Sequence, residues 1–272
     1  MQISNVVGLA LEVMSIPAAP AGRSGPTLVF LHEGLGSISQ WRDWPAQLCA
    51  QLQLPGLVYS RQGYGASTPV HDVRGAPRVE NGVRQGRLLP DYMHHEALTV
   101  LPALLQAQGI ERPILVGHSD GGTIALLHAS QHPVTACIVM APHVMVEDIA
   151  VQAITQARDA YTQGGLRARL AQFHADVDGA FWQWNDVWLS EAFRSFDICT
   201  EIETLTAPLL AIQGEDDAYG TMAQMDELAR HVPHAQLLKL PHCGHSPHKD
   251  QPAQVNAAIV GLIQPLISGL AG

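Results

Sequence analysis

The sequence has few charged residues, and few of those are positive. Charged residues make up 15% of the 272 residues, and 15 Lys and Arg stand against 25 Asp and Glu, which gives a net charge of −10. Nucleic acids and anionic membrane surfaces bind clustered cations, and the densest basic group here is dispersed among glycines (Arg74, Arg78, Arg84 and Arg87). We therefore expect neither as a partner. The hydrophobic share of 47% excludes an intrinsically disordered chain.

Long apolar runs and paired cysteines are also missing. No apolar run approaches the roughly 18 to 20 residues that a membrane span needs. The apolar start at residues 6–10 has no Lys or Arg before Arg23, and Glu12 interrupts it, so we interpret it as one or two strands rather than a secretory leader. The four cysteines are far apart, which favours reduced thiols and a cytoplasmic location (Cys49, Cys137, Cys199 and Cys243). The oligomeric state cannot be read, and a homodimer stays open.

What is present is an alternation of short apolar runs, turns and helical patterns. The runs are rich in Leu, Val and Ile, as in strands buried on both faces of a parallel sheet (residues 27–31, 57–60, 114–116, 136–140, 209–212 and 236–240). Apolar residues recur at helical spacing between them (residues 91–108, 123–131, 222–231 and 252–267). The sequence therefore predicts an α/β fold with a mostly parallel central sheet and helices on both faces.

One stretch interrupts the alternation. Residues 146–203 contain no strand-like run, have helical patterns, and hold three of the five Trp and four of the five Phe. We expect three parts in the chain: a first part of the α/β core at 1–145, a helical cap insertion at 146–203, and a second part of the core at 204–272. The aromatic rings either form the core of an ordinary helical subdomain or line a ligand pocket.

The strongest chemical signal is the string Gly117-His118-Ser119-Asp120-Gly121-Gly122. It follows a predicted strand and precedes a predicted helix, which is the context that gives a G-x-S-x-G string its meaning. A nucleophilic serine must stand exposed on a tight, strained turn. The glycines on either side are needed because a Cβ there would collide with the neighbouring strand or helix.

A serine hydroxyl becomes a good nucleophile only when a base removes its proton, so a histidine and an orienting carboxylate should follow. The turn after residues 209–212 carries Glu215, Asp216 and Asp217. The turn after residues 236–240 carries His242, Gly244 and His245, with further histidines nearby. Both turns lie at the expected carboxyl ends of strands.

With these motifs the sequence resembles the α/β-hydrolase superfamily, in the serine-nucleophile branch with a helical cap. The segment 31–37 with Trp41 is similar to the family's oxyanion loop, and the segment 61–67 to the loop after the next strand. The resemblance implies Ser119 as nucleophile, His245 as base and Asp217, rather than Asp216, as orienting acid. It also implies the backbone N–H groups of Gly34 and Asp120 as oxyanion donors, and no cofactor.

The chain departs from the family where Glu33 replaces a usual glycine and Asp120 a usual apolar residue. Either carboxylate could bind a substrate hydroxyl or order the deacylating water. Alternatively, Asp120 stabilises the first turn of its helix, and Glu33 forms a salt bridge with Arg42 or Arg61. The candidates for the substrate pocket are His32, Glu33, Trp182, Trp184 and Trp188.

A metal site is not expected. His242, His245 and His248 recur every third residue, but the prolines at 241, 247 and 252 make that segment a loop, and His245 already has a role. Cys243 is interpreted as a small packing residue, because no base is assigned to it.

These features favour a cofactor-independent serine hydrolase that acts on a carboxylic ester, or a related acyl bond, of a small apolar or aromatic substrate through an acyl-enzyme. A C–C bond hydrolase of an aromatic-degradation pathway is the alternative within the class. Two further alternatives lie outside the hydrolase class. One is a non-catalytic relative that binds a small molecule, and the other is an enzyme that transfers the acyl group to an acceptor other than water or acts as a lyase.

Overall fold

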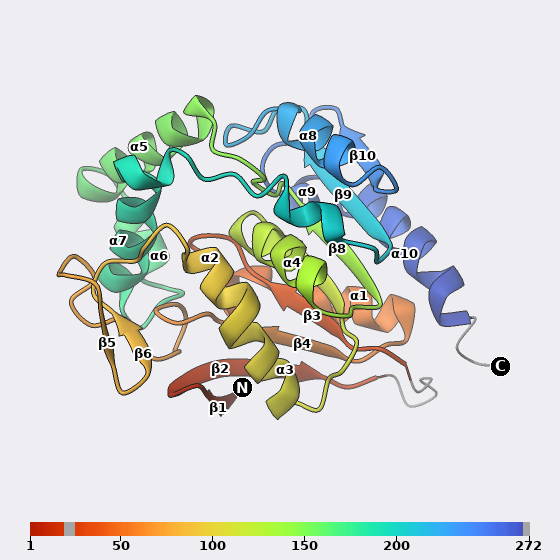
Figure 1. Ribbon diagram of the computed structural model, residues 1–272, viewed down its shortest axis with the longest axis horizontal. Coiled ribbons are helices and arrows are strands. Elements are labelled where there is room, and N and C mark those ends of the chain that lie inside the picture. Colours follow the sequence, from red (N-terminus) through yellow and green to blue (C-terminus); the bar gives the residue numbers. More distant parts are fainter. Residues whose placement is uncertain (19–24, 269–272) are drawn as a thin grey trace.

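The computed structural model describes residues 1–18 and 25–268, so the ends of the expected first and last parts of the chain, at 19–24 and 269–272, lie outside the described residues. Eight of the described strands form one sheet in the order β1-β2-β4-β3-β7-β8-β9-β10 (Figure 1). Their bounds are Gln2–Val6, Leu9–Ile16, Gly56–Tyr59, Leu28–Leu31, Ile114–His118, Ala136–Met140, Leu209–Gly214 and Gln236–Leu240. β2 runs antiparallel to β1 and β4, and every other neighbouring pair is parallel.

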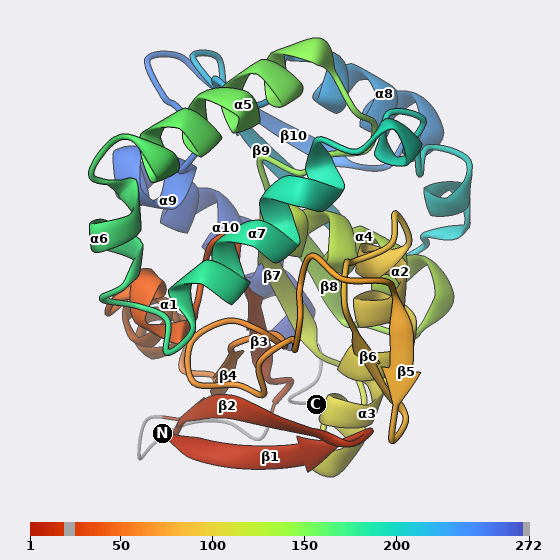
Figure 2. The ribbon, with the colours of Figure 1, turned by 90° about the vertical axis from the view of Figure 1, so that its left-hand side faces the viewer.

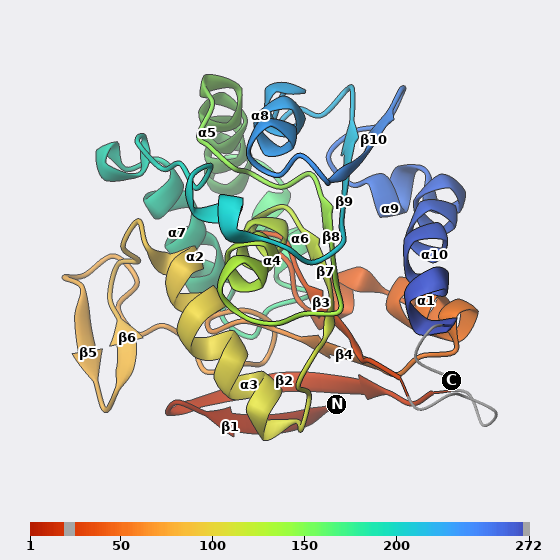
Figure 3. The ribbon, with the colours of Figure 1, turned by 45° about the vertical axis from the view of Figure 1, so that its right-hand side comes forward.

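The strands bury both of their faces in two separate apolar clusters. Along β3, Val29 and Leu31 belong to one cluster and Leu28 and Phe30 to the other, because successive side chains point to opposite faces. Figure 3 shows α3 and α4 on one side of the sheet and α1 and α10 on the other. The helical bounds are Trp44–Leu52 (α1), Tyr92–His95 (α2), Leu101–Ala107 (α3), Asp120–Gln131 (α4), Ala223–His231 (α8), Pro247–Asp250 (α9) and Pro252–Ser268 (α10). The expected sheet with helices on both faces is confirmed.

Several elements differ from the expectation. The helix expected at 91–108 is continuous but includes wider π-type turns at Glu96–Val100, which end two residues before Pro102. In a regular α-helix the proline ring would clash with the carbonyl four residues earlier. The expectation that residues 236–240 are buried on both faces is wrong, because β10 is an edge strand in which only Leu240 is buried. The apolar amino-terminal segment forms β1 and β2, as expected, and a small hairpin of β5 (Arg78–Glu80) and β6 (Val83–Gln85) stands apart from the sheet.

Between β8 and β9 the chain forms α5 (Asp148–Thr162), α6 (Leu166–Leu170) and α7 (Val177–Trp188), followed by short 3-10 turns at Glu191–Phe193 and Glu201–Thr204. These helices face the viewer in Figure 2. That this segment is a separate cap stays a prediction. No helix of the described residues is long and apolar enough to cross a membrane.

Candidate active site

A sharp turn between β7 and α4 presents Ser119. Its backbone angles are φ 53° and ψ −122°, a region that a residue with a side chain enters only at a cost. The turn is tight enough that a Cβ on Gly117 would lie 2.2 Å from the carbonyl oxygen of Gly121. A Cβ on Gly121 would lie 2.1 Å from the carbonyl oxygen of Leu31. Both glycines are therefore required by the close approach of β3, β7 and α4.

Ser119, His245 and Asp217 are joined by hydrogen bonds. His245 Nε2 lies 2.9 Å from Ser119 Oγ, and His245 Nδ1 lies 2.9 Å from both carboxylate oxygens of Asp217. Because a carboxylate only accepts, Nδ1 carries a proton, and in the neutral ring Nε2 is free to accept the hydroxyl proton of Ser119. The structure thus brings together the three side chains expected from the sequence, with Asp217 rather than Asp216 against the ring.

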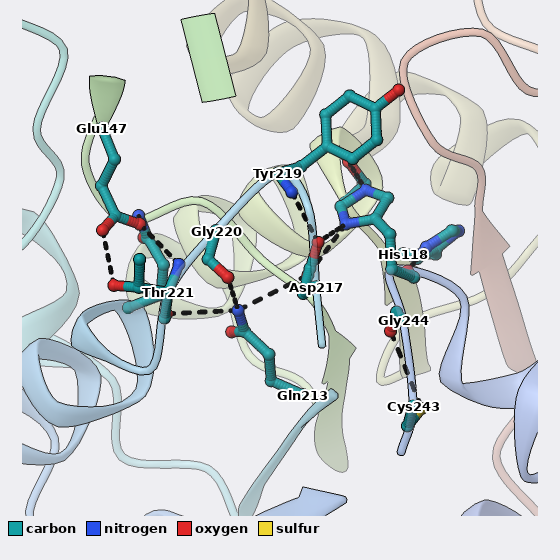
Figure 4. A network of polar contacts seen from close by, with 12 residues as sticks. His118, Glu147, Gln213, Asp217, Tyr219, Gly220, Thr221, Cys243 and Gly244 are labelled. Atoms are coloured by element: carbon teal, nitrogen blue, oxygen red, sulfur yellow. Dashed lines mark hydrogen bonds and ion pairs between the residues drawn. The ribbon is translucent and has the colours of Figure 1, made fainter. Parts of the chain in front are cut away.

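The loop after β9 fixes the carboxylate of Asp217. Its Oδ1 accepts the backbone N–H of Tyr219 at 2.8 Å, and the Gln213 amide donates to the carbonyl of Gly220 at 2.8 Å and more weakly to Asp217 Oδ2 at 3.5 Å (Figure 4). Burial alone would raise the pKa of Asp217, but its hydrogen bond to His245 and the charge of that ring outweigh burial, and the pKa is lowered. Asp217 is therefore held as an ionised acceptor.

A cavity of about 250 Å³ opens beside Ser119 and His245. Trp184 and Trp188 of α7 and Ile154 of α5 line it, together with loop residues that include Glu33, Gly34, His143 and Tyr219. Two residues that the sequence predicted for the pocket, Trp182 and His32, do not line this cavity. The guanidinium of Arg74 lies 4.2 Å from the Trp182 ring. The ring of His32 is buried and accepts the backbone N–H of Arg61.

Gly34 and Asp120 line this cavity, and among the hydrogen bonds of the described residues neither backbone N–H is used. The carbonyl of Ser119 accepts from Gly122 and Thr123, so α4 begins directly at Asp120 with its N–H free. A Cβ on Gly34 would lie 2.2 Å from Trp184 Nε1, so a glycine here lets α7 close over the loop. That these two N–H groups form an oxyanion hole stays a prediction.

Glu33 has different partners from those expected. Its carboxylate lies 3.5 Å from His118 Nδ1 and 3.7 Å from Lys249 Nζ, whereas Arg61 donates only to its backbone carbonyl and Arg42 does not contact it. Burial would raise the pKa of Glu33, but contact with His118 and the charges of His118 and Lys249 outweigh burial and hold the pKa well below its usual value. His118 Nε2 in turn contacts the carbonyl of His245 at 2.7 Å, so His118 links the Glu33 carboxylate to the His245 loop.

Asp120 is buried, and its carboxylate accepts the hydroxyl of Tyr92 at 2.6 Å and lies 3.8 Å from Arg61. Burial raises its pKa, although Arg61 opposes the rise. It lies in the first turn of α4, where a negative charge is favourable, but it caps no helix N–H by a side-chain bond. Asp120 thus belongs to a buried polar network with Tyr92 and Arg61, and it also lines the cavity.

Three ring-bearing residues of the cavity lining had no role in the sequence-based prediction: His118, His143 and Tyr219. His118 stands inside the serine motif, and His143 follows the carboxyl end of β8, a position where site residues gather in parallel sheets. Burial lowers the pKa of His143 to about 3, so its ring is neutral. Tyr219 lies 4.6 Å from the His245 ring, measured between ring centres.

The three histidines of the 242–248 loop do not meet around a common point. His245 faces Ser119, His248 packs on Trp41 and Trp44, and His242 is exposed. Cys243 is buried, and burial raises the pKa of its thiol to about 11, which agrees with a packing role.

Among the described residues, one group brings three metal-ligating atoms within 4.8 Å of one another: Cys199, Glu227 and His231. Two of these already have protein partners, since His231 contacts Glu203 at 2.8 Å and Glu227 contacts Arg230 at 2.9 Å. None of the three lines the cavity at Ser119.

Known proteins resemble the chain along nearly its whole length. The 2-succinyl-6-hydroxy-2,4-cyclohexadiene-1-carboxylate synthase of Enterobacter sp. (strain 638) is 26% identical over 272 residues, covering 90% of this chain and 94% of that protein. The sn-1-specific diacylglycerol lipase ABHD11 of Mus musculus is 25% identical over 267 residues, covering 88% of this chain and 81% of that protein. The enol-lactonase from Burkholderia xenovorans LB400 has the same fold, with a TM-score of 0.71 at 18% identity over 96% of this chain and 99% of that one. The model of the alpha/beta hydrolase family matches residues 28–258, and the chain belongs to that family.

Proposed function

We propose that the protein is a serine hydrolase that cleaves a carboxylic ester, or a closely related acyl bond, of a small substrate through an acyl-enzyme. Ser119 Oγ attacks the acyl carbon while His245 Nε2 takes its proton. The backbone N–H groups of Gly34 and Asp120 donate hydrogen bonds to the oxyanion, and His245 returns the proton to the leaving oxygen. Water, activated by the same ring, then releases the acid and frees Ser119.

The observation that carries this proposal is the unbroken chain of contacts from Asp217 through His245 to Ser119, at 2.9 Å each. Such a chain serves a nucleophile and its base, and these distances fall within the range expected for proton transfer. Residues of the protein itself supply every proton-transfer step, so the proposed reaction includes no cofactor.

The cavity supports a small, largely apolar acyl group. Its volume of about 250 Å³ lies below the ~300–1,000 Å³ typical of sites for drug-sized ligands. Trp184, Trp188 and Ile154 form an apolar wall. Among the related proteins, the names of a lipase and a lactonase support hydrolase chemistry in general, whereas one relative is named a synthase, so the acyl bond is left to be measured.

The test combines covalent labelling with turnover. A fluorophosphonate probe should label the wild-type protein at Ser119, and a panel of aryl esters graded from acetyl to octanoyl should show highest kcat/KM for short acyl groups. The Ser119→Ala variant should lose the label and at least about 10³-fold in kcat, with an unchanged unfolding midpoint.

Absence of labelling in a folded wild-type protein would contradict the proposal and favour a small-molecule-binding relative. Labelling with cleavage of a β-diketone but of no ester would replace the ester assignment by C–C bond hydrolysis. Analysis of the products from an active ester, with and without added alcohols, separates hydrolysis from acyl transfer.

A further inference from the structure

A second, larger hollow lies next to the catalytic cavity. Its volume is about 690 Å³, and it runs between the segment 40–47 on one side and α6 on the other, with α9 at its end. An ion pair links the two hollows: Glu33 lines the catalytic cavity, and Lys249, whose ammonium group lies 3.7 Å from the Glu33 carboxylate, lines the second hollow. We call this second hollow the seam groove.

More cations than carboxylates line the seam groove: Arg42, Arg169 and Lys249 against Asp43. Among the Lys and Arg residues of the described ranges, only Arg42 and Arg169 have no side-chain hydrogen bond or ion pair with a described residue, and both line this groove. Lys249 adds a third cation, at 3.7 Å from Glu33. In a chain with a net charge of −10, two unpaired arginines in one groove indicate a binding surface for an anion.

The backbone around Arg42 is strained in the same manner as at Ser119. Its angles are φ 54° and ψ −132°, and its neighbours Trp41 and Trp44 are buried and stacked at 5.5 Å between ring centres. Strain of this kind costs energy and persists where the surroundings fix the conformation, often at ligand sites. The buried indoles fix the turn, and Arg42 itself is exposed and lines the groove.

The groove is connected to His245 by the segment that leads into α9. His245 must return its proton to the leaving oxygen, so the alcohol part of a substrate lies toward His245. The chain continues from His245 directly into α9, and His248 and Lys249 of α9 line the groove. The acyl part then occupies the cavity against Trp184 and Trp188 on α7.

We propose that the natural substrate is an ester of a small acyl group whose alcohol part ends in an anion, a carboxylate or a phosphate, and that Arg42, Arg169 and Lys249 bind this anion in the seam groove. The inference rests on the proposed hydrolase function and extends it to a substrate class. Arginine suits both anions because its guanidinium binds either one through two parallel hydrogen bonds.

The experiment compares acetate esters that differ only at the distal end of the alcohol. The probes are the acetyl ester of 3-(4-hydroxyphenyl)propanoate, its neutral primary amide, and the analogue that ends in phosphate. For the wild type we expect kcat/KM at least tenfold higher for one or both anionic esters than for the amide at low salt, and a smaller ratio in 0.5 M NaCl, where exposed charges are screened. The anion whose ester has the higher kcat/KM shows whether the site prefers a carboxylate or a phosphate.

The variant Arg42→Gln with Arg169→Gln should bring the anionic esters to within about twofold of the neutral amide, mainly through KM. The matched control is Arg167→Gln, on the same helix, because Arg167 already pairs with Asp178 at 2.7 Å and does not line the groove. The control should keep the wild-type preference.

A wild-type protein that labels at Ser119 and hydrolyses all three probes alike overturns the anion site and leaves the hydrolase proposal standing. A preference that persists in the double variant, or that Arg167→Gln removes equally, also overturns the assignment to the seam groove. Failure of labelling and of all ester turnover counts against the hydrolase proposal itself. The comparison of probes on the wild type needs no variant, so it still tests the anion site if the double variant fails to fold.

Discussion

Two turns of this molecule place a residue with a side chain in the same costly backbone conformation, and their surroundings are opposite. Ser119 has φ 53° and ψ −122°, and Arg42 has φ 54° and ψ −132°. Ser119 is buried, and its hydroxyl meets His245 at 2.9 Å. Arg42 is exposed, and its guanidinium meets no partner among the described residues. The strained turn at Ser119 supports a contact inside the protein, with His245, and the strained turn at Arg42 supports the proposed contact with the substrate anion.

The two turns also differ in what holds them. The elbow at Ser119 is fixed by backbone bonds, from Ser119 N–H to Met140 at 2.9 Å and from Gly122 N–H to Ser119 at 2.8 Å. At Arg42 one weaker backbone bond, to Ser39 at 3.3 Å, is supplemented by the stacked indoles on either side. We therefore expect changes at the elbow to have large effects and changes at Arg42 to have small ones.

The largest effect is expected for Asp217→Asn. An amide in place of the carboxylate lets the side chain donate to His245, so the ring takes the tautomer that cannot accept the Ser119 proton, and kcat should fall about 10⁴-fold. The unfolding midpoint should change little, because Asn keeps the shape and can still accept the Tyr219 N–H. Pre-steady-state measurement of acylation checks this. A fall of less than about tenfold would mean that Asp217 does not orient the base.

The next effect is expected on stability, for Gly121→Ala. The new Cβ would lie 2.1 Å from the carbonyl oxygen of Leu31, a backbone atom of β3 that cannot move alone. We expect a loss of at least about 3 kcal/mol in the free energy of unfolding, measured by urea denaturation. Gly165→Ala is the matched control, since a Cβ there meets nothing within 4 Å. Equal stability of the two variants would contradict the tight elbow.

The sequence predicted the elbow well because its determinants are local. Gly117 and Gly121 flank the serine within a strand–turn–helix pattern, and the required backbone follows from these few residues. The helical period also contains a signal that the sequence-based prediction missed: Trp184 and Trp188 are four residues apart and share a face of α7, whereas Trp182 lies about 200° around the helix from Trp184. The period alone would have excluded Trp182 from the pocket shared by the other two.

The contacts between loops were less predictable. Arg42 and Arg61 were the expected partners of Glu33, but His118 and Lys249 occupy that place because the loop after β10 folds over the loop after β3. The edge position of β10 likewise depends on strand order, which the pattern of apolar residues does not determine. The seam groove was not foreseen, since it combines residues from three distant segments.

A third effect concerns His248, which packs against Trp41 of one turn and His118 of the other. Burial lowers the pKa of His248 to about 2, so the folded protein holds it neutral while the unfolded chain takes up a proton below its ordinary pKa of about 6.5. Its contribution to stability is therefore complete above pH 6.5 and falls as the pH drops, by on the order of 3 kcal/mol at pH 4. Urea denaturation of wild type and His248→Phe at pH 7 and pH 4 should show a smaller loss in the variant. Equal losses would mean that His248 does not titrate between the two states.

A smaller effect is expected for Glu33→Gln, which keeps the shape and removes the charge that links His118 to Lys249. Glu33 supports the loop of His245 through His118, so we expect kcat to fall severalfold for neutral and anionic esters, with about 1 kcal/mol lost in stability. The KM of the anionic esters should fall relative to that of the neutral ester, because Lys249 loses its counter-charge. Ester turnover and thermal unfolding measure both. Selective loss on substrates that carry a hydroxyl would instead identify Glu33 as a direct substrate ligand, and unchanged kinetics and stability would remove both roles.

The smallest effect, and the one that separates the two turns most directly, is expected for Arg42→Gly. Glycine adopts φ 54° without steric cost, so the folded state loses its strain, while the unfolded chain gains conformational freedom that partly offsets this. We expect the free energy of unfolding to rise by about 0.5 kcal/mol, and the preference for anionic esters to shrink in the same variant. Arg169→Gly has no such strain to relieve, because Arg169 lies in α6, and should lose about 1 kcal/mol. If Arg42→Gly is destabilised as much as Arg169→Gly, the turn at Arg42 is not strained in solution. If it is stabilised but the preference for anionic esters is unchanged, the strain has no part in substrate binding.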